Sequence, residues 1–385
     1  MINKDEIFYL QWHLSEACNL KCLHCYQENK EIVNLNKGQL FNILDQYKNL
    51  LKELGVKGHI NLTGGEPLCS PYFFDILEQF KKDSNLYSFC ILTNGTLIND
   101  EIAKKISEYS PKYVQVSLEG GKRINDYVRG EGVYNKVASA LKFLRKYGIY
   151  TSISFTSTKL NYKEFPKVVE FGIKNHASAI WSDRFIPVKS NNVKNIYNET
   201  DKQKVIRNNE FLMDSKELQE FLEIMYKEKE KIEKKQNKLN VKFYNKYKEF
   251  VDLYNSGKIY KRHSMEFYKD KYGYRLPEIK MHRALQFTKT NEMPYHCTAG
   301  NSLLTVMENG DLVPCRRMPI IVGNLLKDDM LYLYKNNKVL LDLQKQEIPK
   351  DCLKCNYFKS CLGGLKCLNY AVKGNYNIKD INCIF

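Results

Sequence analysis

The chain lacks the features that mark membrane and secreted proteins. No apolar stretch in its 385 residues approaches the roughly 20 residues of a membrane-spanning helix. The first residues, Met1 to Glu6, do not form the basic and apolar regions of a secretory signal. No nucleic-acid-binding motif is found either. These absences predict a cytoplasmic protein that is not a membrane or nucleic-acid-binding protein.

Acidic residues are also comparatively scarce. Asp and Glu number 44 against 60 Lys and Arg, which gives a net charge of +16. Part of this excess reflects a compositional bias, because Lys, Asn, Ile and Tyr are all abundant. A basic surface nevertheless favours an acidic partner. Since no nucleic-acid motif accompanies the charge, we expect an acidic peptide.

Cysteine, in contrast, is abundant. Twelve cysteines in a cytoplasmic chain favour metal binding over disulfides. Cys18, Cys22 and Cys25 follow the apolar segment 7–14 with the spacing C-x3-C-x2-C. Three thiolates can hold three irons of a [4Fe–4S] cluster and leave the fourth iron open to a small chelating ligand. The alternative is a zinc ion with His24 as the fourth ligand, although His24 lies between two of the cysteines, where one small ion is hard to enclose.

Short apolar strands alternate with amphipathic helices from residue 7 to about residue 190. In the first helix, Asn36 and Gln39 match a capping box and Gly55 marks the end, whereas the second is expected to open at Ser70-Pro71. Six strand–helix units predict a parallel sheet with its chemistry at the carboxyl ends of the strands. The expected strands are 7–14, 58–62, 86–92, 113–118, 150–156 and 178–186.

Beyond residue 190 the composition changes twice. Residues 190–295 are highly charged and predicted to be helical, and runs such as 226–235 are typical of solvated helix faces. Cysteines become dense again from Cys297 onward. We therefore divide the chain into an α/β core at 1–235, a helical bridge or insert at 236–295 and a cysteine-rich domain at 296–385.

A second motif follows the second predicted strand, where the sequence reads Thr63-Gly64-Gly65-Glu66-Pro67. Together with the three-cysteine loop it resembles the radical S-adenosylmethionine (SAM) superfamily. The resemblance implies a partial (β/α)6 TIM barrel as the core. It also implies a [4Fe–4S] cluster whose open iron is chelated by SAM, and one-electron cleavage of SAM to a 5′-deoxyadenosyl radical.

The same resemblance assigns contacts with SAM. Glu66 and the Gly64–Gly65 backbone would receive the SAM ammonium through a charge-assisted contact. His24 would lie beside the adenine, and Arg129 would neutralise the SAM carboxylate unless it is a surface arginine. Three further residues lie in family-like motifs after the third and fourth strands: Asn94, Ser117 and Glu119. Glu119 stands where the family usually has an Asp that contacts the ribose of SAM.

The C-terminal cysteines resemble a SPASM domain, which carries two auxiliary [4Fe–4S] clusters. The resemblance implies that a first auxiliary cluster is bound by Cys297, Cys315 and Cys367, and a second by Cys352, Cys355, Cys361 and Cys383. A zinc ribbon is the alternative, but seven cysteines fit one zinc site poorly.

Three departures from the SPASM pattern stand out. Cys367 lies two positions later than usual after Cys361. The first cluster has only three visible ligands, so its fourth iron is either open, for example to a substrate thiolate, or closed by a protein side chain such as His296. Arg316 stands where sulfatase maturases place a general-base Asp, and an arginine cannot accept a proton.

The resemblance implies a peptide-modifying enzyme, in particular a maturase of ribosomally made peptides. The radical would abstract hydrogen from a peptide, which is then crosslinked, epimerised or oxidised. The alternatives are a sulfatase-maturase-like protein oxidase with another base, and a non-enzymatic metal-stabilised binding protein. The expected partners are an acidic leader peptide, a flavodoxin or ferredoxin and a separate leader-recognition protein, since the first strand starts near residue 7.

No catalytic residue is assigned from the sequence, and two residues are weak candidates. Cys69 follows the Gly-Gly-Glu loop and is either a hydrogen-atom donor or a small buried residue, as we expect for Cys90. Asp183 ends the sixth predicted strand beside Arg184, where the pair either faces the active-site mouth or forms a surface salt bridge. His13 and Trp12 are expected to be packing residues.

Overall fold

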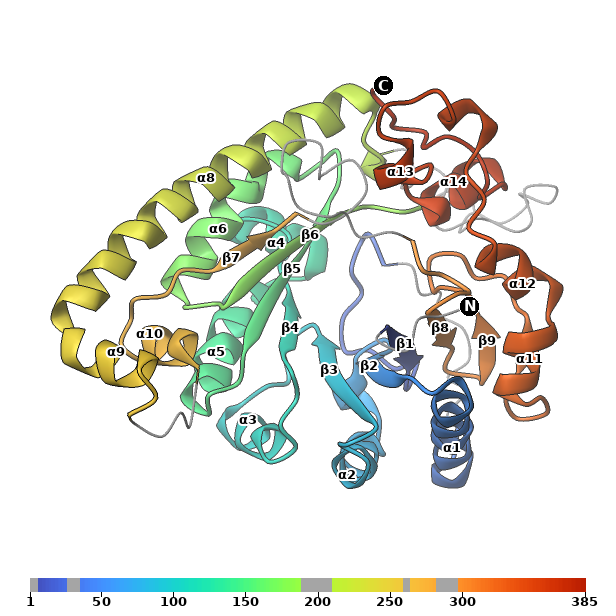
Figure 1. Ribbon diagram of the computed structural model, residues 1–385, viewed down its shortest axis with the longest axis horizontal. Helices are drawn as coiled ribbons and strands as arrows, with labels where there is room; N and C mark the ends of the chain where they lie inside the picture. Colours follow the sequence, from blue (N-terminus) through green and yellow to red (C-terminus); the bar gives the residue numbers. More distant parts are fainter. Residues whose placement is uncertain (1–5, 26–34, 188–209, 259–263, 282–296) are drawn as a thin grey trace.

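A ten-stranded sheet, with helices along its outer side, organises the chain (Figure 1). The computed structural model describes residues 6–25, 35–187, 210–258, 264–281 and 297–385. Seven strands run parallel in the order of the chain. They are β1 (Ile7–His13), β2 (Lys57–Thr63), β3 (Tyr87–Thr93), β4 (Val114–Ser117), β5 (Thr151–Ser157), β6 (Ala179–Arg184) and β7 (Glu278–Lys280). The six predicted strands and the partial barrel are thus confirmed.

The cysteine-rich C-terminal part extends this sheet on the other side of β1. Strand β8 (Leu303–Val306) pairs with β1 in parallel, and β9 (Asp311–Val313) and β10 (Gly323–Asn324) continue the sheet antiparallel. Four helices follow: α11 (Met330–Asn336), α12 (Lys338–Gln344), α13 (Phe358–Cys361) and α14 (Lys366–Lys373). Because the C-terminal part shares the sheet of the core, it is attached to the core by backbone hydrogen bonds as well as by side chains.

The helices of the core lie between the strands, as the periodicity predicts. They are α1 (Lys37–Leu54), α2 (Phe73–Lys82), α3 (Asp100–Ser107), α4 (Lys122–Arg129), α5 (Val133–Lys146) and α6 (Phe165–Lys174). The capping box of Asn36 and Gln39 and the C-cap at Gly55 are confirmed. The predicted start of the second helix is wrong: α2 begins at Phe73, because a short 3-10 helix, η1 (Pro67–Cys69), leads into a turn at Ser70-Pro71.

The segment after β6 is dominated by one long helix, α8 (Ser215–Lys246), followed by α9 (Lys248–Asn255) and α10 (Met265–Lys271). Helix α8 packs against α6 and β7 and runs unbroken past residue 235, so the division drawn there falls inside a helix (Figure 1). None of the described helices is long and apolar enough to cross a membrane.

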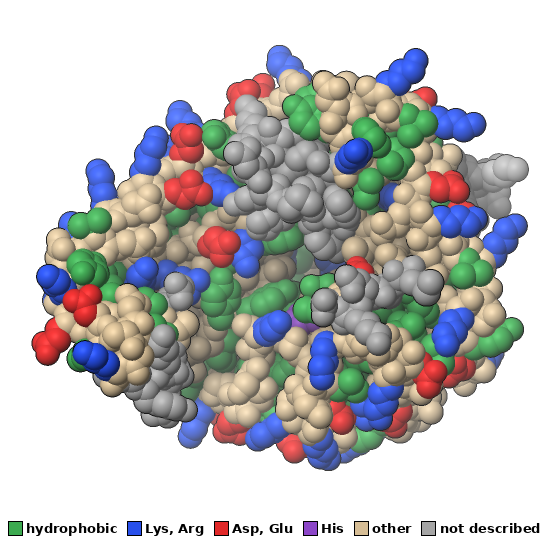
Figure 2. Space-filling model, viewed as in Figure 1, with side chains coloured by type: hydrophobic (Ala, Val, Ile, Leu, Met, Phe, Trp, Pro, Cys, Tyr) green, Lys and Arg blue, Asp and Glu red, His purple; other side chains and the backbone are tan. Residues whose placement is uncertain are grey.

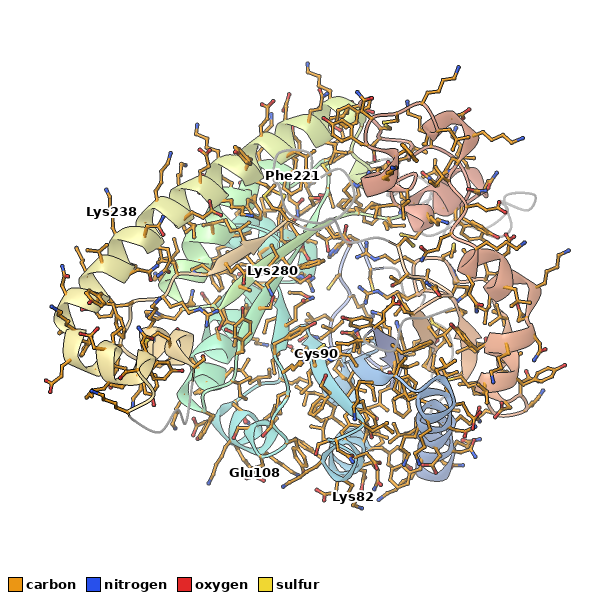
Figure 3. The ribbon with its side chains drawn as sticks, in the orientation of Figure 1. Lys82, Cys90, Glu108, Phe221, Lys238 and Lys280 are labelled. Carbon is orange, nitrogen blue, oxygen red and sulfur yellow. The ribbon has the colours of Figure 1, made fainter. Side chains whose placement is uncertain are left out.

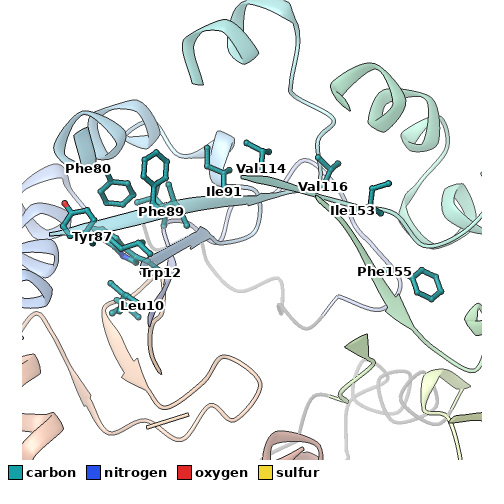
Figure 4. Close-up of a cluster of buried hydrophobic side chains, with 14 of the residues drawn as sticks. Leu10, Trp12, Phe80, Tyr87, Phe89, Ile91, Val114, Val116, Ile153 and Phe155 are labelled. Atoms are coloured by element: carbon teal, nitrogen blue, oxygen red, sulfur yellow. The ribbon is translucent and has the colours of Figure 1, made fainter. Parts of the chain in front are cut away.

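The two faces of the sheet differ in chemistry. Leu10, Trp12 and Phe89 belong to the apolar cluster between the sheet and its helices (Figure 4). Side chains alternate along a strand, so the register row formed by Gln11, Asn61 and Cys90 lies on the opposite, inner face. Cys90 is buried there and its thiol donates to Asn61 Oδ1 at 3.0 Å, far from peripheral residues such as Lys82, Glu108 and Lys238 (Figure 3). The inner wall of the barrel is therefore polar.

Candidate active site and auxiliary cluster sites

The loop that carries Cys18, Cys22 and Cys25 leaves the carboxyl end of β1. Partial burial, together with the nearby Glu66, Cys22 and Cys25, raises the pKa of the Cys18 thiol to about 11. Cys18 and Cys25 are exposed and Cys22 is half-buried. A metal that coordinates thiols deprotonates them outright.

The Gly-Gly-Glu motif holds this loop by direct backbone contact. The Gly65 amide donates to the Ser15 carbonyl at 2.8 Å, and the Glu66 amide donates to the Ala17 carbonyl at 2.9 Å. A Cβ on Gly64 would lie 2.4 Å from the Ser15 carbonyl oxygen, and one on Gly65 would lie equally close to that of Glu16. Both glycines are therefore required for the close approach of the two loops.

Glu66 is fully buried behind this contact. Its carboxylate accepts hydrogen bonds from the Asn94 amide and the Thr93 hydroxyl, both at 2.7 Å, and from the Leu68 amide at 3.2 Å. Burial raises the pKa of Glu66 to about 7, although these hydrogen bonds oppose the rise. An arriving cation would favour the ionised form, which suits a residue that receives an ammonium group.

Asn94 connects the third strand to the cysteine loop. Its side-chain amide donates to Asn19 Oδ1 at 2.9 Å and lies 3.9 Å from Cys18 Sγ, and its oxygen accepts from Thr96. Asn19 in turn donates to the Thr96 hydroxyl at 2.8 Å. The contributions of Asn19 and Thr96 were not predicted; their signal in the sequence is only that each adjoins a motif residue.

Glu119 forms a second buried centre on the other side of the loop. Its Oε1 accepts from Arg129 Nη2 at 2.5 Å and lies 3.1 Å from His24 Nε2, and its Oε2 accepts from the Thr156 amide at 3.0 Å. Burial alone would raise the pKa of Glu119, but Arg129 and His24 outweigh it and lower the pKa to about 2. Arg129 is only 9% exposed, so it is not a surface arginine.

This centre reaches the cysteine loop through two contacts. Arg129 Nη1 lies 3.9 Å from Cys22 Sγ, and the Leu23 amide donates to the Val128 carbonyl at 2.8 Å. Ser117, the last residue of β4, is half-buried. The structure thus brings the predicted SAM-contact residues of β2, β3 and α4 around one loop.

The first C-terminal cysteine group converges near the end of β6. Burial raises the pKa of Cys367, and Cys315 and Cys297 raise it further, whereas Arg317 lowers it and Asp183 raises it. Asp183 Oδ2 lies 3.7 Å from Arg317 Nη1. Asp183 is therefore brought next to the first cysteine group, at the mouth of the barrel. His296 lies outside the described residues.

The second cysteine group lines a single cavity. Cys352, Cys355, Cys361 and Cys383 surround a space of about 330 Å³, together with the rings of Tyr357 and Phe385, which are in contact at a tilt of 42°. Four soft thiol donors around one cavity suit an iron–sulfur cluster. Within the described ranges, no three His, Cys, Asp or Glu side chains converge on a position for a single metal ion.

Of the two alternatives for Asp183 and Arg184, the surface salt bridge is wrong, because both side chains are buried. Arg184 is 3% exposed and donates through both terminal nitrogens to Asp380, at 2.9 and 2.8 Å. Asp380 is 196 residues away in the chain, so this contact had no local signal. Cys69 is half-buried in η1, and burial raises the pKa of its thiol. His13 and Trp12 are buried on β1.

A sheet of this topology, with a cysteine loop after β1 and further cysteine groups at its mouth, defines a radical SAM enzyme with an iron–sulfur C-terminal domain. The family comparisons agree. Residues 12–172 match the radical SAM superfamily, and residues 297–356 match the SPASM iron–sulfur cluster-binding domain. The chain therefore belongs to the radical SAM superfamily and carries a SPASM domain, so its cofactors are SAM and iron–sulfur clusters. The non-enzymatic alternative is wrong.

Three relatives illustrate the range of the family. The AdoMet-dependent heme synthase of Methanosarcina barkeri is 24% identical over 381 residues, which cover 98% of this chain and 96% of the relative. The structure of anSMEcpe with AdoMet and the Cp18Cys peptide has a TM-score of 0.67 at 21% identity, covering 97% of this chain and 93% of that one. Streptococcus suis SuiB bound to its precursor peptide SuiA has a TM-score of 0.63 at 18% identity, covering 98% and 76%.

Proposed function

We propose that this protein is a maturase that modifies a ribosomally made peptide. SAM bound at the first cluster would supply a 5′-deoxyadenosyl radical, which abstracts hydrogen from a side chain or Cα of the peptide. Crosslinking through a thioether or C–C bond, epimerisation or oxidation would follow. The observation that carries this proposal is the position of the first C-terminal cysteine group beside Asp183, at the mouth of a polar-walled barrel where a substrate segment has to lie.

The residues of the core would divide the work of holding SAM. Cys18, Cys22 and Cys25 would bind the first cluster, and Gly64, Gly65 and Glu66 would receive the SAM ammonium. Arg129 would neutralise the SAM carboxylate. Glu119 would contact the ribose of SAM, and its Oε1 would also hold Arg129 and His24 in place.

The C-terminal residues would hold two auxiliary clusters. The first would use Cys297, Cys315 and Cys367, with its fourth iron open to a substrate thiolate or closed by a protein side chain. The second would fill the cavity of Cys352, Cys355, Cys361 and Cys383. A flavodoxin or ferredoxin would supply the electron.

The sulfatase-maturase variant of this chemistry needs a base that Arg316 cannot provide. Asp183 interacts electrostatically with Cys367 of the first cysteine group, and we propose it as the proton acceptor. Arg317 Nη1, 3.7 Å from Asp183 Oδ2, would orient its carboxylate. Cys69 remains a weaker candidate, as a hydrogen-atom donor.

The partner side of the proposal rests on charge. Lys and Arg side chains are spread around the visible face (Figure 2), and the net charge is +16. Such a surface attracts an acidic leader segment, with or without a separate leader-recognition protein. The anSMEcpe and SuiB structures, each solved with a peptide, support this proposal.

The experiment is anaerobic reconstitution with iron and sulfide, followed by reaction with SAM, dithionite and short peptides encoded beside the gene. The expected result is formation of 5′-deoxyadenosine together with a peptide that has lost a pair of hydrogens or, for epimerisation in D2O, gained deuterium. If SAM is cleaved but every peptide encoded beside the gene keeps its mass and deuterium content, the peptide proposal is rejected.

A second candidate is modification of an acidic tetrapyrrole. The similarity to the AdoMet-dependent heme synthase favours it, since that similarity extends along 98% of this chain. Porphyrin carboxylates would also suit a basic protein. Incubation with an iron coproporphyrin under the same conditions separates the two: a change in the mass of the porphyrin, with no change in any peptide, would favour the tetrapyrrole.

A further inference from the structure

A buried ion pair between Arg184 and Asp380 joins segments of the protein that are far apart in the sequence. Arg184 ends β6, and its guanidinium donates to Asp380 Oδ1 at 2.9 Å, to Asp380 Oδ2 at 2.8 Å and to Asn382 Oδ1 at 3.3 Å. The side chains of Arg184 and Asp380 are 3% and 1% exposed. A buried pair with both oxygens engaged is the strong, orientation-specific form of this contact.

Asp380 also fixes the backbone around both C-terminal cysteine groups. Its Oδ2 accepts from the Leu365 amide, two residues before Cys367, and its Oδ1 accepts from the Asn382 amide, directly before Cys383; both distances are 2.9 Å. A single carboxylate therefore positions a segment of the first group and a segment of the second.

The surrounding chain is built to accept this carboxylate. A Cβ on Gly364 would lie only 2.2 Å from Asp380 Oδ2, and the φ of Gly364 is +84°, so only glycine fits. Asn382 donates from its side chain to the Met213 carbonyl at 2.9 Å, which ties the same loop to the segment before α8. The pair is thus embedded in a set of close-packed contacts rather than formed between two free side chains.

The pair is also oriented with respect to the cysteine groups. Asp380 lines the cavity of the second group, together with its four cysteines, whereas Arg184 ends β6 and interacts electrostatically with Cys367 of the first group. Charges act strongly on their neighbours in a buried, weakly polarisable environment. A cation stabilises the more negative, reduced state of a cluster beside it, and an anion destabilises it.

We propose that the Arg184–Asp380 pair positions both auxiliary clusters against the barrel and separates their reduction potentials. The guanidinium makes the first cluster easier to reduce, and the carboxylate makes the second harder to reduce. Both residues are positioning residues, because they act through the backbone segments next to Cys367 and Cys383. The inference rests on the two auxiliary clusters of the proposed function, and it is independent of whether the substrate is a peptide.

The test compares the reconstituted full-length protein with the double variant Arg184→Gln/Asp380→Asn. This variant keeps hydrogen-bonding groups and removes both charges, so no lone buried charge is left. The readouts are iron and sulfide content, thermal unfolding, and the potentials of the two auxiliary clusters from a redox titration followed by electron paramagnetic resonance. Lys146→Gln/Asp100→Asn, which neutralises an ion pair whose side chains are 58% and 47% exposed, is the matched control.

In the double variant, the first auxiliary potential is expected to fall and the second to rise, with iron content unchanged; the control should shift neither. Arg184→Lys keeps the charge but loses the two-pronged contact, so it should retain the first potential more closely than the double variant while lowering the unfolding temperature. Unchanged potentials in a fully loaded double variant, or shifts of the same sign at both clusters, would overturn the inference. Wild-type protein without auxiliary iron would instead reject the proposed function, and the inference with it.

Discussion

Replacing Gly65 by Ala gives the sharpest test of how the SAM loop is held. The added Cβ would lie 2.4 Å from the Glu16 carbonyl oxygen and 2.5 Å from that of Ala17. Both atoms belong to the backbone, so neither can rotate away as a side chain would. The loop that leads into Cys18 has to move, or the two backbone hydrogen bonds made by Gly65 and Glu66 have to lengthen.

Overpacking of this kind costs about 1–3 kcal/mol. Because the strain falls on one loop, it should act mainly on the equilibrium between binding-competent and displaced loop positions. That energy corresponds to a decrease of roughly 5- to 150-fold in the competent population. We therefore expect Gly65→Ala to lower 5′-deoxyadenosine formation within this range, while the sheet and the C-terminal cysteine groups remain folded.

The assay is the initial rate of 5′-deoxyadenosine formation with dithionite, at equal protein and with iron content measured on the same samples. Gly38→Ala is the matched control. Gly38 lies in the first turn of α1, and the nearest atom to its added Cβ is Asn36 Oδ1 at 3.4 Å. The control should be neutral or slightly stabilising. A Gly65→Ala enzyme that cleaves SAM at the wild-type rate would refute the close-approach argument.

Three further outcomes are expected. Replacing the three loop cysteines together by Ala should abolish 5′-deoxyadenosine formation and leave other iron bound; undiminished formation would contradict the assignment of Cys18, Cys22 and Cys25. Reconstituted wild-type protein should approach roughly twelve irons per chain, at about four per cluster, whereas one or two zinc ions without sulfide would favour the zinc alternatives. Affinity for an acidic peptide should fall as ionic strength rises, because the Debye screening length shortens from about 30 Å at 0.01 M to about 8 Å at 0.15 M. Salt-independent binding would mean that the basic surface is not the docking site.

Most strands and helices of the α/β core could be predicted from local sequence patterns. The apolar runs of β1 to β6 and the capping box at Asn36 are short-range patterns, and the structure confirms them. The predicted start of α2 was wrong because Ser70-Pro71 matches an N-cap pattern locally. In the structure, the buried Glu66 caps a 3-10 turn over Pro67–Cys69, and α2 begins only after it. The Gly-Gly-Glu motif could be located from the sequence, but its contact with residues 15–17 could not.

Contacts between distant segments account for what was missed. The pairing of β8 with β1 and the bond of Arg184 to Asp380 join residues that no periodicity relates. A surface position was an alternative for both Arg129 and Asp183. A sequence does not show that Arg129 pairs with Glu119, or that Asp183 pairs with Arg317, in the folded protein. Charged residues that are paired across the fold look like surface residues until the fold is known.

Transfer of deuterium from a labelled substrate to 5′-deoxyadenosine tests the central proposal most directly. The reconstituted enzyme is incubated with SAM, dithionite and the neighbouring peptide carrying deuterium at its side-chain and Cα positions. We predict deuterium in the 5′-deoxyadenosine and a matching change in the peptide, both lost in the variant without Cys18, Cys22 and Cys25. Unlabelled 5′-deoxyadenosine beside an unchanged peptide, with an iron coproporphyrin consumed in its place, would contradict the peptide-maturase account.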